Sequence, residues 1–353
     1  MKILLCSRYG GQGASSRIRY LQYLPYFRSQ GAEVTVVPLF SDDYVRALYE
    51  GGARRQEVLV GYWRRLRALI GARRFDVVIV EKELFPFLPA VAERLLRVMG
   101  VPYVVDYDDA LFHRYDRHPS ALVRALLGRK IDAVMRHAAV VVAGNDYLAD
   151  RARQAGAPRI EVIPTVVDTE RYQLRPDVEA ATPVVGWIGT PMTSRYLRPL
   201  LPVFEALQEE MPVRFVAVGA RPEDFVGTPV ETRLWSEETE VESIRQFDIG
   251  IMPLEDSPWE RGKCGYKLIQ YMACGLPVVA SPVGVNQTIV IPEENGLQAD
   301  TPEAWKHALR ELLQAGEPIR RSMGQKGRQR VEEWYSLKAQ APRLFNTISE
   351  AVR

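Results

Sequence analysis

The chain is poor in cysteine and has no long apolar run. Only three of its 353 residues are cysteines, at positions 6, 264 and 274. None has a second cysteine or a histidine at the spacing of a metal site, and three cysteines do not make a disulfide framework. Four apolar residues separate Lys2 from Ser7, which is too short a run for a signal peptide, and no stretch is long enough to span a bilayer. We therefore expect a cytoplasmic protein.

The chain also has little net charge, but the charge is unevenly divided. The total is +2, whereas residues 1–175 hold 27 Lys and Arg against 19 Asp and Glu, a net +8. Such asymmetry suggests an anionic partner for the first half, either a membrane surface or an acidic acceptor. No aromatic-rich basic repeat or nucleic-acid motif accompanies it, so nucleic acid is not an expected partner.

What the sequence does contain is a repeated alternation of apolar runs and helical patterns. With 47% hydrophobic and 25% charged residues, the composition is that of a globular protein long enough for two domains. The alternation predicts an α/β fold with two doubly wound parallel sheets. A polar linker is expected at about residues 169–183. The predicted strands cover residues 2–7, 33–39, 76–81, 101–106, 138–143, 160–163, 184–188, 214–218, 230–234, 248–252 and 276–281.

The most informative stretch is residues 247–286, which contains a strand, a glycine-containing loop, a helix and a second strand. Gly262 and Gly265 let the loop backbone approach a ligand. The helix start presents unpaired N–H groups and a positive dipole end, which favours an anion. Lys263 and Lys267 add two charges there, and a diphosphate would satisfy both. The alternative is that both lysines are solvated surface residues of a crossover helix.

This stretch resembles the donor-binding segment of the retaining group 1 glycosyltransferases, family 4, which have the GT-B fold. The family patterns are EGFGxxxxEAMACGxPVV and, in other branches, PxKLxEYxAxGxPVV. When residues 272–275 (MACG) are aligned, the two family glutamates fall on Gly262 and Gln270, so both carboxylates are absent. The lysine of the second pattern falls on Lys267. The resemblance implies that Gln270 bonds the nucleotide ribose without a charge, with Glu260 an out-of-register substitute for the sugar-contacting glutamate.

A second part of the resemblance is residues 189–196, GTPMTSRY, which match the family pattern GRLxxxKG. In that pattern an Arg and a Lys bind the diphosphate; Thr190 stands at the Arg and Arg195 at the Lys. Lys263 would make up for the missing cation. Trp235 follows a predicted strand where the family binds the base, although a core tryptophan or a solvated Arg195 would also fit the sequence. The donor-binding residues implied are Gly11, Gly13, Gly189, Thr190, Trp235, Cys264, Gly265, Tyr266 and Gln270.

In the first half, polar residues follow two predicted strands. Residues 9–17 form a glycine-rich turn, which could also be an ordinary tight strand-to-helix connection. Residues 106–109 (DYDD) end another strand, where ligands of open α/β sheets bind. Alone this cluster could hold a divalent cation; by resemblance, Asp108 matches a family histidine near the reacting sugar. The expected acceptor-side residues are Arg17, Glu83, Asp106, Asp109 and His118, and the expected catalytic residues are Arg195, Lys263, Lys267 and Asp108, without a metal.

Residues 57–74 predict a basic amphipathic helix. Its apolar side contains residues 58, 59, 62, 66, 69 and 70, and arginines at 64, 65, 67, 73 and 74 surround it. Such a helix can lie on anionic lipid. A solvated outer face is the alternative, and the sequence does not choose between them.

The resemblance covers nearly the whole chain and implies two facing Rossmann-like domains. We expect an acceptor-side domain at 1–172, a nucleotide-sugar-binding domain at 173–335, and a last helix at 336–353, part of a helix from 328, that crosses back to the first domain. The implied activity is transfer of a hexosyl unit from a nucleoside diphosphate sugar to a glycan, a lipid-linked saccharide or a small molecule, with retention, in polysaccharide biosynthesis of the cell envelope. The donor is a substrate and no prosthetic group is expected. Contact with the inner face of the cell membrane is possible. The alternatives are a sugar-nucleotide epimerase and a non-catalytic binding or scaffold protein.

Overall fold

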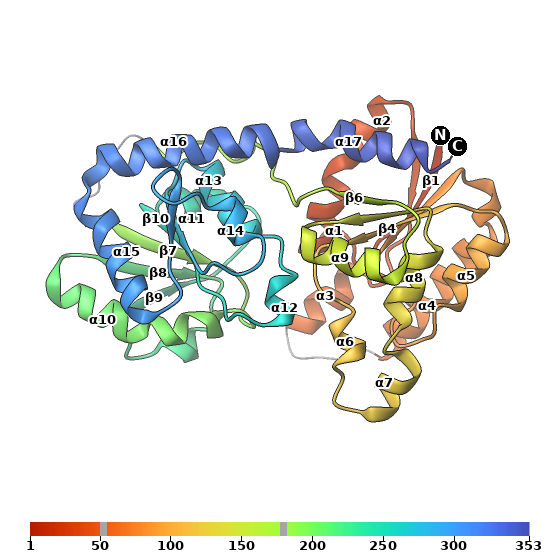
Figure 1. Ribbon diagram of the computed structural model, residues 1–353, viewed down its shortest axis with the longest axis horizontal. Coiled ribbons are helices and arrows are strands. Elements are labelled where there is room, and N and C mark those ends of the chain that lie inside the picture. The colour runs from red at the N-terminus through yellow and green to blue at the C-terminus, as the bar shows by residue number, and fades with distance from the viewer. Residues whose placement is uncertain (50–54, 177–181, 353) are drawn as a thin grey trace. The chain divides into compact units, whose positions relative to one another are not determined.

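The computed structural model describes residues 1–49, 55–176 and 182–352 (Figure 1). Part of the predicted linker, 177–181, lies outside the described residues. The chain forms two compact units. Unit 1 comprises Met1–Val166, Gly262–Cys264 and Leu337–Arg353, and unit 2 comprises Val167–Arg261 and Gly265–Ser336. The last helix therefore belongs to the same unit as the first strand.

Unit 1 contains a six-stranded parallel sheet in the order β2-β1-β3-β4-β5-β6. The order reverses between β1 and β3, so the loops that follow these two strands diverge to opposite faces of the sheet. The strands are β1 (Lys2–Cys6), β2 (Glu33–Val36), β3 (Val77–Glu81), β4 (Tyr103–Tyr107), β5 (Val140–Ala143) and β6 (Ile160–Val162). The helices are α1 (Ala14–Arg19), α2 (Leu24–Ser29), α3 (Asp42–Tyr49), α4 (Arg55–Ile70), α5 (Val91–Val98), α6 (His113–Asp116), α7 (Ala121–Leu127), α8 (Lys130–His137), α9 (Asp146–Ala155) and α17 (Leu337–Glu350).

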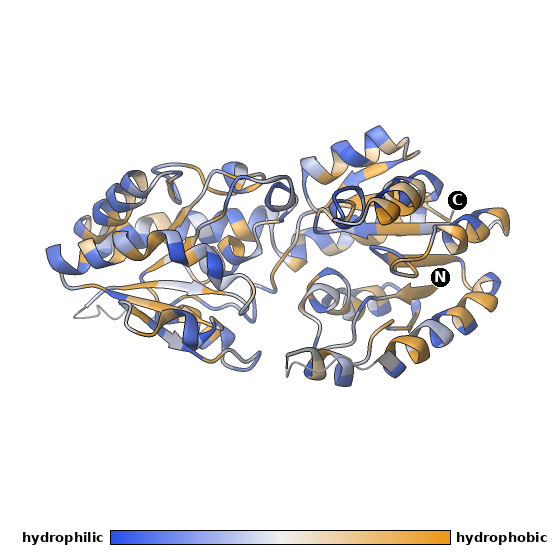
Figure 2. Ribbon diagram, turned by 90° about the horizontal axis from the view of Figure 1, so that it is seen from below, coloured by the Kyte–Doolittle hydropathy of each residue, from blue (hydrophilic) through white to orange (hydrophobic). Residues whose placement is uncertain are grey.

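The central strands of unit 1 read as apolar runs because helices cover both faces of the sheet. All residues of β3, β4 and β5 are buried, and Figure 2 shows this sheet mainly in orange. Alternate residues of one strand enter two different hydrophobic clusters, one on each face. This is the burial expected of a parallel sheet inside a doubly wound fold.

Unit 2 contains a second six-stranded parallel sheet, in the order β12-β11-β10-β7-β8-β9, which reverses between β7 and β10. The α/β fold with two doubly wound sheets is thereby confirmed. The strands are β7 (Val184–Ile188), β8 (Arg214–Val218), β9 (Val230–Arg233), β10 (Ile249–Met252), β11 (Val278–Ala280) and β12 (Gly296–Gln298). The helices are the 3-10 helices η3 (Ser194–Leu200) and η4 (Pro222–Phe225), α10 (Leu201–Glu210), α11 (Glu240–Arg245), α12 (Pro258–Arg261), α13 (Tyr266–Ala273), α14 (Asn286–Ile289), α15 (Pro302–Gln314) and α16 (Gly316–Trp334).

Two helix predictions were wrong in detail. The predicted helix 57–74 ends at Ile70 and is followed by a 3-10 turn, Ala72–Arg74. The predicted closing helix from 328 is two helices, α16 and α17, because the chain leaves helical geometry at Tyr335 and Ser336. There Val167 donates its N–H to the Tyr335 carbonyl and pairs with Ser336. Strand β12 was missed because its three residues, Gly296–Gln298, contain one apolar side chain and form no apolar run.

Arg65 corrects the predicted solvent face of α4. Its side chain is fully buried and donates to the carbonyls of Ser7, Val37 and Leu84. The helix therefore turns an arginine inward, where three backbone carbonyls accept hydrogen bonds from its terminal nitrogens. This arginine does not belong to a basic outer surface.

Candidate functional site

The sheet order of unit 2 locates a ligand site. In open α/β sheets, ligands bind at the carboxyl ends of the strands where the strand order reverses. In unit 2 this is the edge shared by the ends of β7 and β10. The loop after β7 carries Gly189, Thr190 and Arg195, and the segment after β10 leads to α13. The two segments singled out by the sequence therefore meet at the same reversal point.

The start of α13 has the properties expected of an anion site. Its N-cap is Gly265, which has a left-handed conformation (φ 65°) and provides no side-chain cap. A Cβ atom there would lie 2.3 Å from the Ile289 side chain, so the position requires glycine. Lys267 is half-buried, and its Nζ lies 5.3 Å from the centre of the Trp187 ring. The backbone N–H groups and a fixed ammonium group thus occur together.

The loop after β7 is closely packed and internally bonded. A Cβ at Gly189 would lie 2.4 Å from the Trp187 ring, and the Thr190 N–H donates to Thr193 Oγ1 over 3.1 Å. Arg195 is mostly exposed and lies 3.6 Å from the buried carboxylate of Glu260. Glu260 also accepts hydrogen bonds from Tyr196 and Ser257. Arg195 is therefore held against the segment that precedes α13.

Three of the predicted donor residues belong to one hydrogen-bonded group. Gln270 donates to the Tyr172 hydroxyl over 2.8 Å, and the Tyr266 hydroxyl lies 3.3 Å from the same Tyr172 hydroxyl. Tyr172 donates to the Glu240 carboxylate, which also accepts from Trp235 Nε1 over 2.9 Å. Sequence reasoning missed Tyr172 and Glu240. The one sequence feature that could have indicated Glu240 is its place as an acidic residue at the start of the helix after a predicted strand. No sequence feature indicates Tyr172, which lies in the predicted linker.

Lys263 and Cys264 belong to unit 1. The Lys263 carbonyl accepts from Asn145 Nδ2 over 2.9 Å, and the Cys264 thiol donates to the Asp108 carbonyl over 3.2 Å. A Cβ at Gly144 would lie 2.3 Å from the Cys264 sulfur. Burial raises the pKa of this thiol far above its usual value. Cys264 therefore packs against the ends of β4 and β5 in unit 1, and its predicted contact with the donor stays a prediction.

Unit 1 has its own polar cluster at the ends of β3 and β4. Lys82, a non-glycine residue at φ 67°, places its ammonium 2.8 Å from Asp108 and 3.4 Å from Asp109. The Ser15 hydroxyl lies within hydrogen-bond distance of both Asp108 and Glu81 and donates its one proton to either carboxylate. A left-handed conformation in a lysine is strained and is commonly retained at functional sites. Lys82 was not singled out by the sequence analysis.

The two aspartates beside Lys82 have opposite pKa shifts. Burial alone would raise the pKa of Asp108, but Lys82, Arg19 and Ser15 together hold it below its usual value. For Asp109 burial prevails over Lys82 and the pKa is raised. Asp108 is thus a stable anion and Asp109 is the more basic carboxylate, with 34% of its side chain exposed.

Asp106 and Glu83 are buried and ion-paired, and their predicted contact with an acceptor stays a prediction. Asp106 is 1% exposed and paired with Arg19. Glu83 has no exposed side-chain surface and is paired with Lys130, with a further hydrogen bond from Tyr115 at 2.7 Å. Each carboxylate is therefore already paired with a buried cation of unit 1.

The predicted His118 packs against Phe87, and its Nδ1 accepts from the Ser120 N–H. The preceding histidine, His113, is more polar in its contacts: it lies 2.9 Å from Asp116 and 2.8 Å from the Tyr147 hydroxyl. The acceptor role of His118 stays a prediction, but its ring nitrogen is already used in a local turn.

The glycine loop after β1 does not resemble a phosphate cradle. Gly11 is exposed with open space around it, and a Cβ at Gly13 would collide with the Tyr9 side chain at 2.1 Å. The Gln12 N–H donates to the Asp42 carboxylate over 2.9 Å, which places a negative charge in the loop. Gly13 therefore serves packing, and this loop disfavours an anion. Arg17, on α1, is half-buried.

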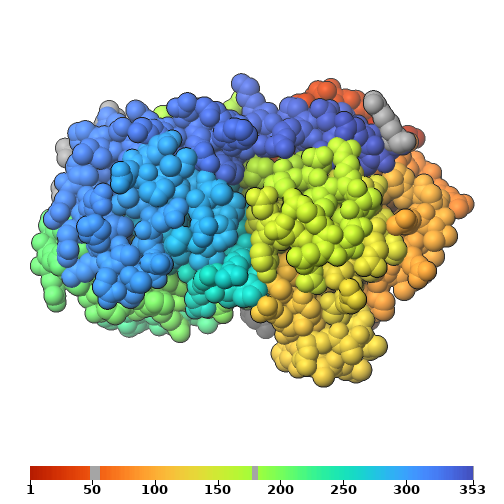
Figure 3. Space-filling model, in the orientation of Figure 1, coloured from red at the N-terminus to blue at the C-terminus, as the bar shows by residue number. Residues whose placement is uncertain are grey.

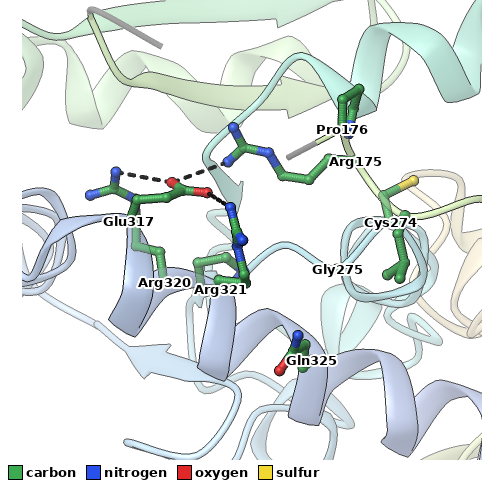
Figure 4. A pocket seen from close by; sticks show the side chains of 10 residues that line it. Arg175, Pro176, Cys274, Gly275, Glu317, Arg320, Arg321 and Gln325 are labelled. Carbon is green, nitrogen blue, oxygen red and sulfur yellow. Dashed lines mark hydrogen bonds and ion pairs between the residues drawn. The ribbon is translucent and has the colours of Figure 1, made fainter. Parts of the chain in front are cut away.

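A separate pocket in unit 2 is shown in Figure 4. It encloses about 190 Å³. One of its lining residues, Glu317, forms ion pairs with Arg175, Arg320 and Arg321. It lies at the amino ends of β10 and β11, beside Gly275, so it is at the sheet edge opposite the predicted donor site. Its lining residues are Leu174, Arg175, Pro176, Cys274, Gly275, Pro277, Glu317, Arg320, Arg321 and Gln325.

Within residues 1–49, 55–176 and 182–352, no three His, Cys, Asp or Glu side chains are grouped as metal ligands. Across the same part of the chain, no helix has the length and apolar character needed to cross a bilayer.

Comparison with known proteins agrees with this architecture. Residues 4–165 match the family model described as a glycosyl transferase 4-like domain. Residues 182–315 match the model described as glycosyl transferases group 1. The two models fall on unit 1 and unit 2 respectively and together span most of the chain. A comparison with curated protein sequences finds no significant match.

Solved structures give the same fold. Sucrose-phosphate synthase from Thermosynechococcus elongatus has a TM-score of 0.72 at 16% identity, over 99% of this chain and 98% of that chain. Anabaena Alr3699/HepE in complex with UDP has a TM-score of 0.70 at 16% identity, over 99% and 100%. A glycosyltransferase from Rickettsia africae has a TM-score of 0.71 at 14% identity, over 100% and 98%. With two family models covering both units and this fold over its full length, the chain belongs to the group 1 glycosyltransferases of the GT-B fold.

Proposed function

We propose that the protein transfers a hexosyl unit from a nucleoside diphosphate sugar to a glycan, a lipid-linked saccharide or a small molecule, with retention of configuration. We further propose that it does so in the cytoplasm during polysaccharide biosynthesis for the cell envelope. The observation that supports this most directly is the uncapped start of α13, where Lys267 is fixed over Trp187 beside the loop that carries Arg195. That combination fits a diphosphate.

The chemistry assigned to these groups is leaving-group stabilisation. As the bond between sugar and diphosphate breaks, negative charge grows on the leaving phosphate oxygen. A preorganised ammonium or guanidinium group beside that oxygen interacts more strongly with the transition state than with the bound donor. We assign this role to Lys267 and Arg195. We propose that Asp108 and Asp109 accept hydrogen bonds from sugar or acceptor hydroxyls. The charge of Lys263 acts on Asp109.

The test is a donor screen of the purified protein with UDP-, GDP-, ADP- and TDP-sugars, first by thermal shift and then by product analysis. The HepE structures contain UDP and UDP-glucose, so UDP-glucose is the first donor to test. Appearance of the sugar on an acceptor supports a transferase. Isomerisation of the sugar without an acceptor product supports an epimerase, and binding without turnover supports a binding protein. Failure of every donor to bind contradicts all three.

Metal independence is the first prediction. If Lys267, Arg195 and the helix start neutralise the leaving diphosphate, a divalent ion is redundant. Turnover in excess EDTA should therefore remain within about twofold of the untreated rate. Loss of a charge-stabilising group typically lowers kcat by about 10² to 10³, and EDTA would remove no such group. Full loss of activity that manganese restores would instead make Asp108 and Asp109 candidate metal ligands.

We also propose that α4 contacts an anionic membrane surface. Its outer face carries an apolar stripe at helical spacing, Leu59, Trp63, Leu66 and Ile70, with exposed fractions of 44% to 78%. Arg64 and Arg67 are exposed beside the stripe, and the helix contains a single acid. A projecting segment of unit 1 at α7, yellow at the bottom of Figure 3, exposes two further leucines, at positions 122 and 126. Apolar and cationic groups together suit an anionic lipid interface.

The second prediction follows from that surface. The protein should bind vesicles that contain phosphatidylglycerol, and binding should weaken as salt rises, because exposed charges are screened beyond about 10 Å at 0.1 M. Trp63→Ser should weaken binding about tenfold through loss of buried apolar area. Leu234→Ser, at a leucine of unit 2 that is also largely exposed, is the control. Absence of binding at low salt would leave α4 as a solvated face.

A further inference from the structure

Trp235 lies at the predicted donor edge with its ring partly exposed and its N–H group fixed. Trp235 follows β9 and lies close to Gly219 at the end of β8. A Cβ atom added to Gly219 would lie 3.1 Å from the Trp235 Cβ. The same Cβ at Gly219 would lie 2.3 Å from the Gly189 carbonyl. The ends of three neighbouring strands therefore converge at this indole ring, which is 37% exposed.

The group that fixes the indole is a buried carboxylate. Glu240, 5% exposed, begins α11 and accepts from Trp235 Nε1 over 2.9 Å. On its other oxygen it accepts from Tyr172, and Arg171 lies 3.7 Å away. Tyr172 is 2% exposed, and burial raises its pKa well above the usual value, so it remains a protonated donor. Gln270 of α13 donates to Tyr172.

This arrangement has a directional consequence. A hydrogen bond from Nε1 to a charged acceptor that is itself held by Tyr172 and Arg171 removes rotational freedom from the indole. The ring then presents one fixed face to the ligand edge. A planar, partly exposed aromatic ring is a suitable surface for stacking a nucleobase, and such stacking is tolerant of base identity because every base has a π face.

We propose that Glu240 is a positioning residue that holds Trp235 as a stacking platform for the base of the donor nucleotide, with Tyr172 and Gln270 linking this platform to α13. The inference rests on the proposed function, since it requires a nucleoside diphosphate at this edge. It assigns base affinity to Trp235, held by Glu240 of α11, and diphosphate affinity to the start of α13, so the two contributions are separable by experiment.

The experiment is calorimetric binding of uridine, guanosine, adenosine and thymidine diphosphates and of inorganic pyrophosphate to the full chain. Glu240→Met, which removes the acceptor of the indole N–H, should weaken the best nucleoside diphosphate roughly tenfold. Pyrophosphate affinity should change by less than about twofold, because the α13 site is intact. Glu242→Met on the same helix, at an exposed acid paired with Arg245, is the matched control and should change neither ligand.

A double-mutant cycle tests whether Glu240 acts through Trp235. In a Trp235→Ala background, Glu240→Met should cause no further loss of nucleoside diphosphate affinity. Trp235→Phe removes the donor of the same hydrogen bond, so it provides a second test if Glu240→Met does not fold. It should also weaken nucleoside diphosphate binding and leave pyrophosphate binding unchanged. Additive losses, an equal loss of pyrophosphate affinity, or unchanged nucleotide affinity in both variants would overturn the inference while leaving the glycosyltransferase proposal standing. If no nucleoside diphosphate binds the parent protein, both proposals fail.

Discussion

Lys267→Ala is expected to lower kcat at saturating donor by about 10² to 10³. The ammonium group lies at the start of α13, and its contact with the Trp187 ring holds it in place. Because charge on the leaving oxygen grows only as the bond breaks, loss of a fixed cation there costs about 3 to 4 kcal/mol of transition-state stabilisation. A cation that only anchors the bound diphosphate would instead raise KM and leave kcat unchanged.

The measurement is kcat and KM of the folded variant beside two comparators. Lys267→Arg should recover little, because a planar guanidinium does not replace a compact ammonium. Lys306→Ala removes a lysine of α15 that is paired with Glu210 and should behave like the parent. Arg195→Ala should lower kcat in the same direction as Lys267→Ala. A kcat of Lys267→Ala within about threefold of the parent, far from the expected loss, would return this residue to the solvated-surface interpretation.

Arg19→Met is expected to destabilise unit 1 by about 3 to 5 kcal/mol at neutral pH. Arg19 binds both oxygens of Asp106 and also donates to the Ile163 carbonyl. Both side chains are almost completely buried. Removing the guanidinium leaves a carboxylate in the core without its cation, and such a charge costs far more than the pair contributed. For a unit of this size the melting temperature should fall by on the order of 10 °C.

The pH dependence of this loss has a definite sign. Burial raises the pKa of Asp106 to about 6, although Arg19 opposes the shift. A carboxyl group whose pKa is higher in the folded than in the unfolded protein stabilises the folded state when it is protonated. This stabilisation is complete below the unfolded pKa, near 3.9, and is lost as the pH rises through the folded pKa. Without Arg19 the folded pKa rises further. The deficit of Arg19→Met should therefore shrink between pH 8 and pH 5, as Asp106 takes up a proton.

Thermal unfolding followed by circular dichroism at pH 8 and pH 5 measures both effects. Arg159→Met is the surface control, because its pairs with Glu161 and Glu350 are partly exposed and exposed pairs contribute about 1 kcal/mol or less. Adding Asp106→Asn to Arg19→Met should recover part of the loss, since the uncompensated charge is gone. A deficit that is equal at both pH values would show that lost packing, and not the buried charge, is responsible.

Local features of the molecule were predictable from the sequence. The strands of both sheets and the helix α13 depend on short apolar runs, helical spacing and glycine or proline stops, which are encoded by neighbouring residues. The prediction of an anion site at the α13 start needs only Gly265, Lys267 and the helix direction. These predictions required no knowledge of which elements pack together, and the errors lay at helix ends and in the three-residue strand β12.

The partners of individual side chains were decided by tertiary structure. Tyr172 and Glu240 meet although they are 68 residues apart, and Lys82 reaches Asp108 and Asp109 from a different strand. Arg65 is turned inward because backbone carbonyls from three segments surround it. Each of these contacts depends on strand order and on how loops pack at the sheet edge. The sequence alone therefore determined which elements form and where an anion site is predicted. The chain packing determined which charges are buried or paired, because burial and long-range pairing arise only when distant segments come together.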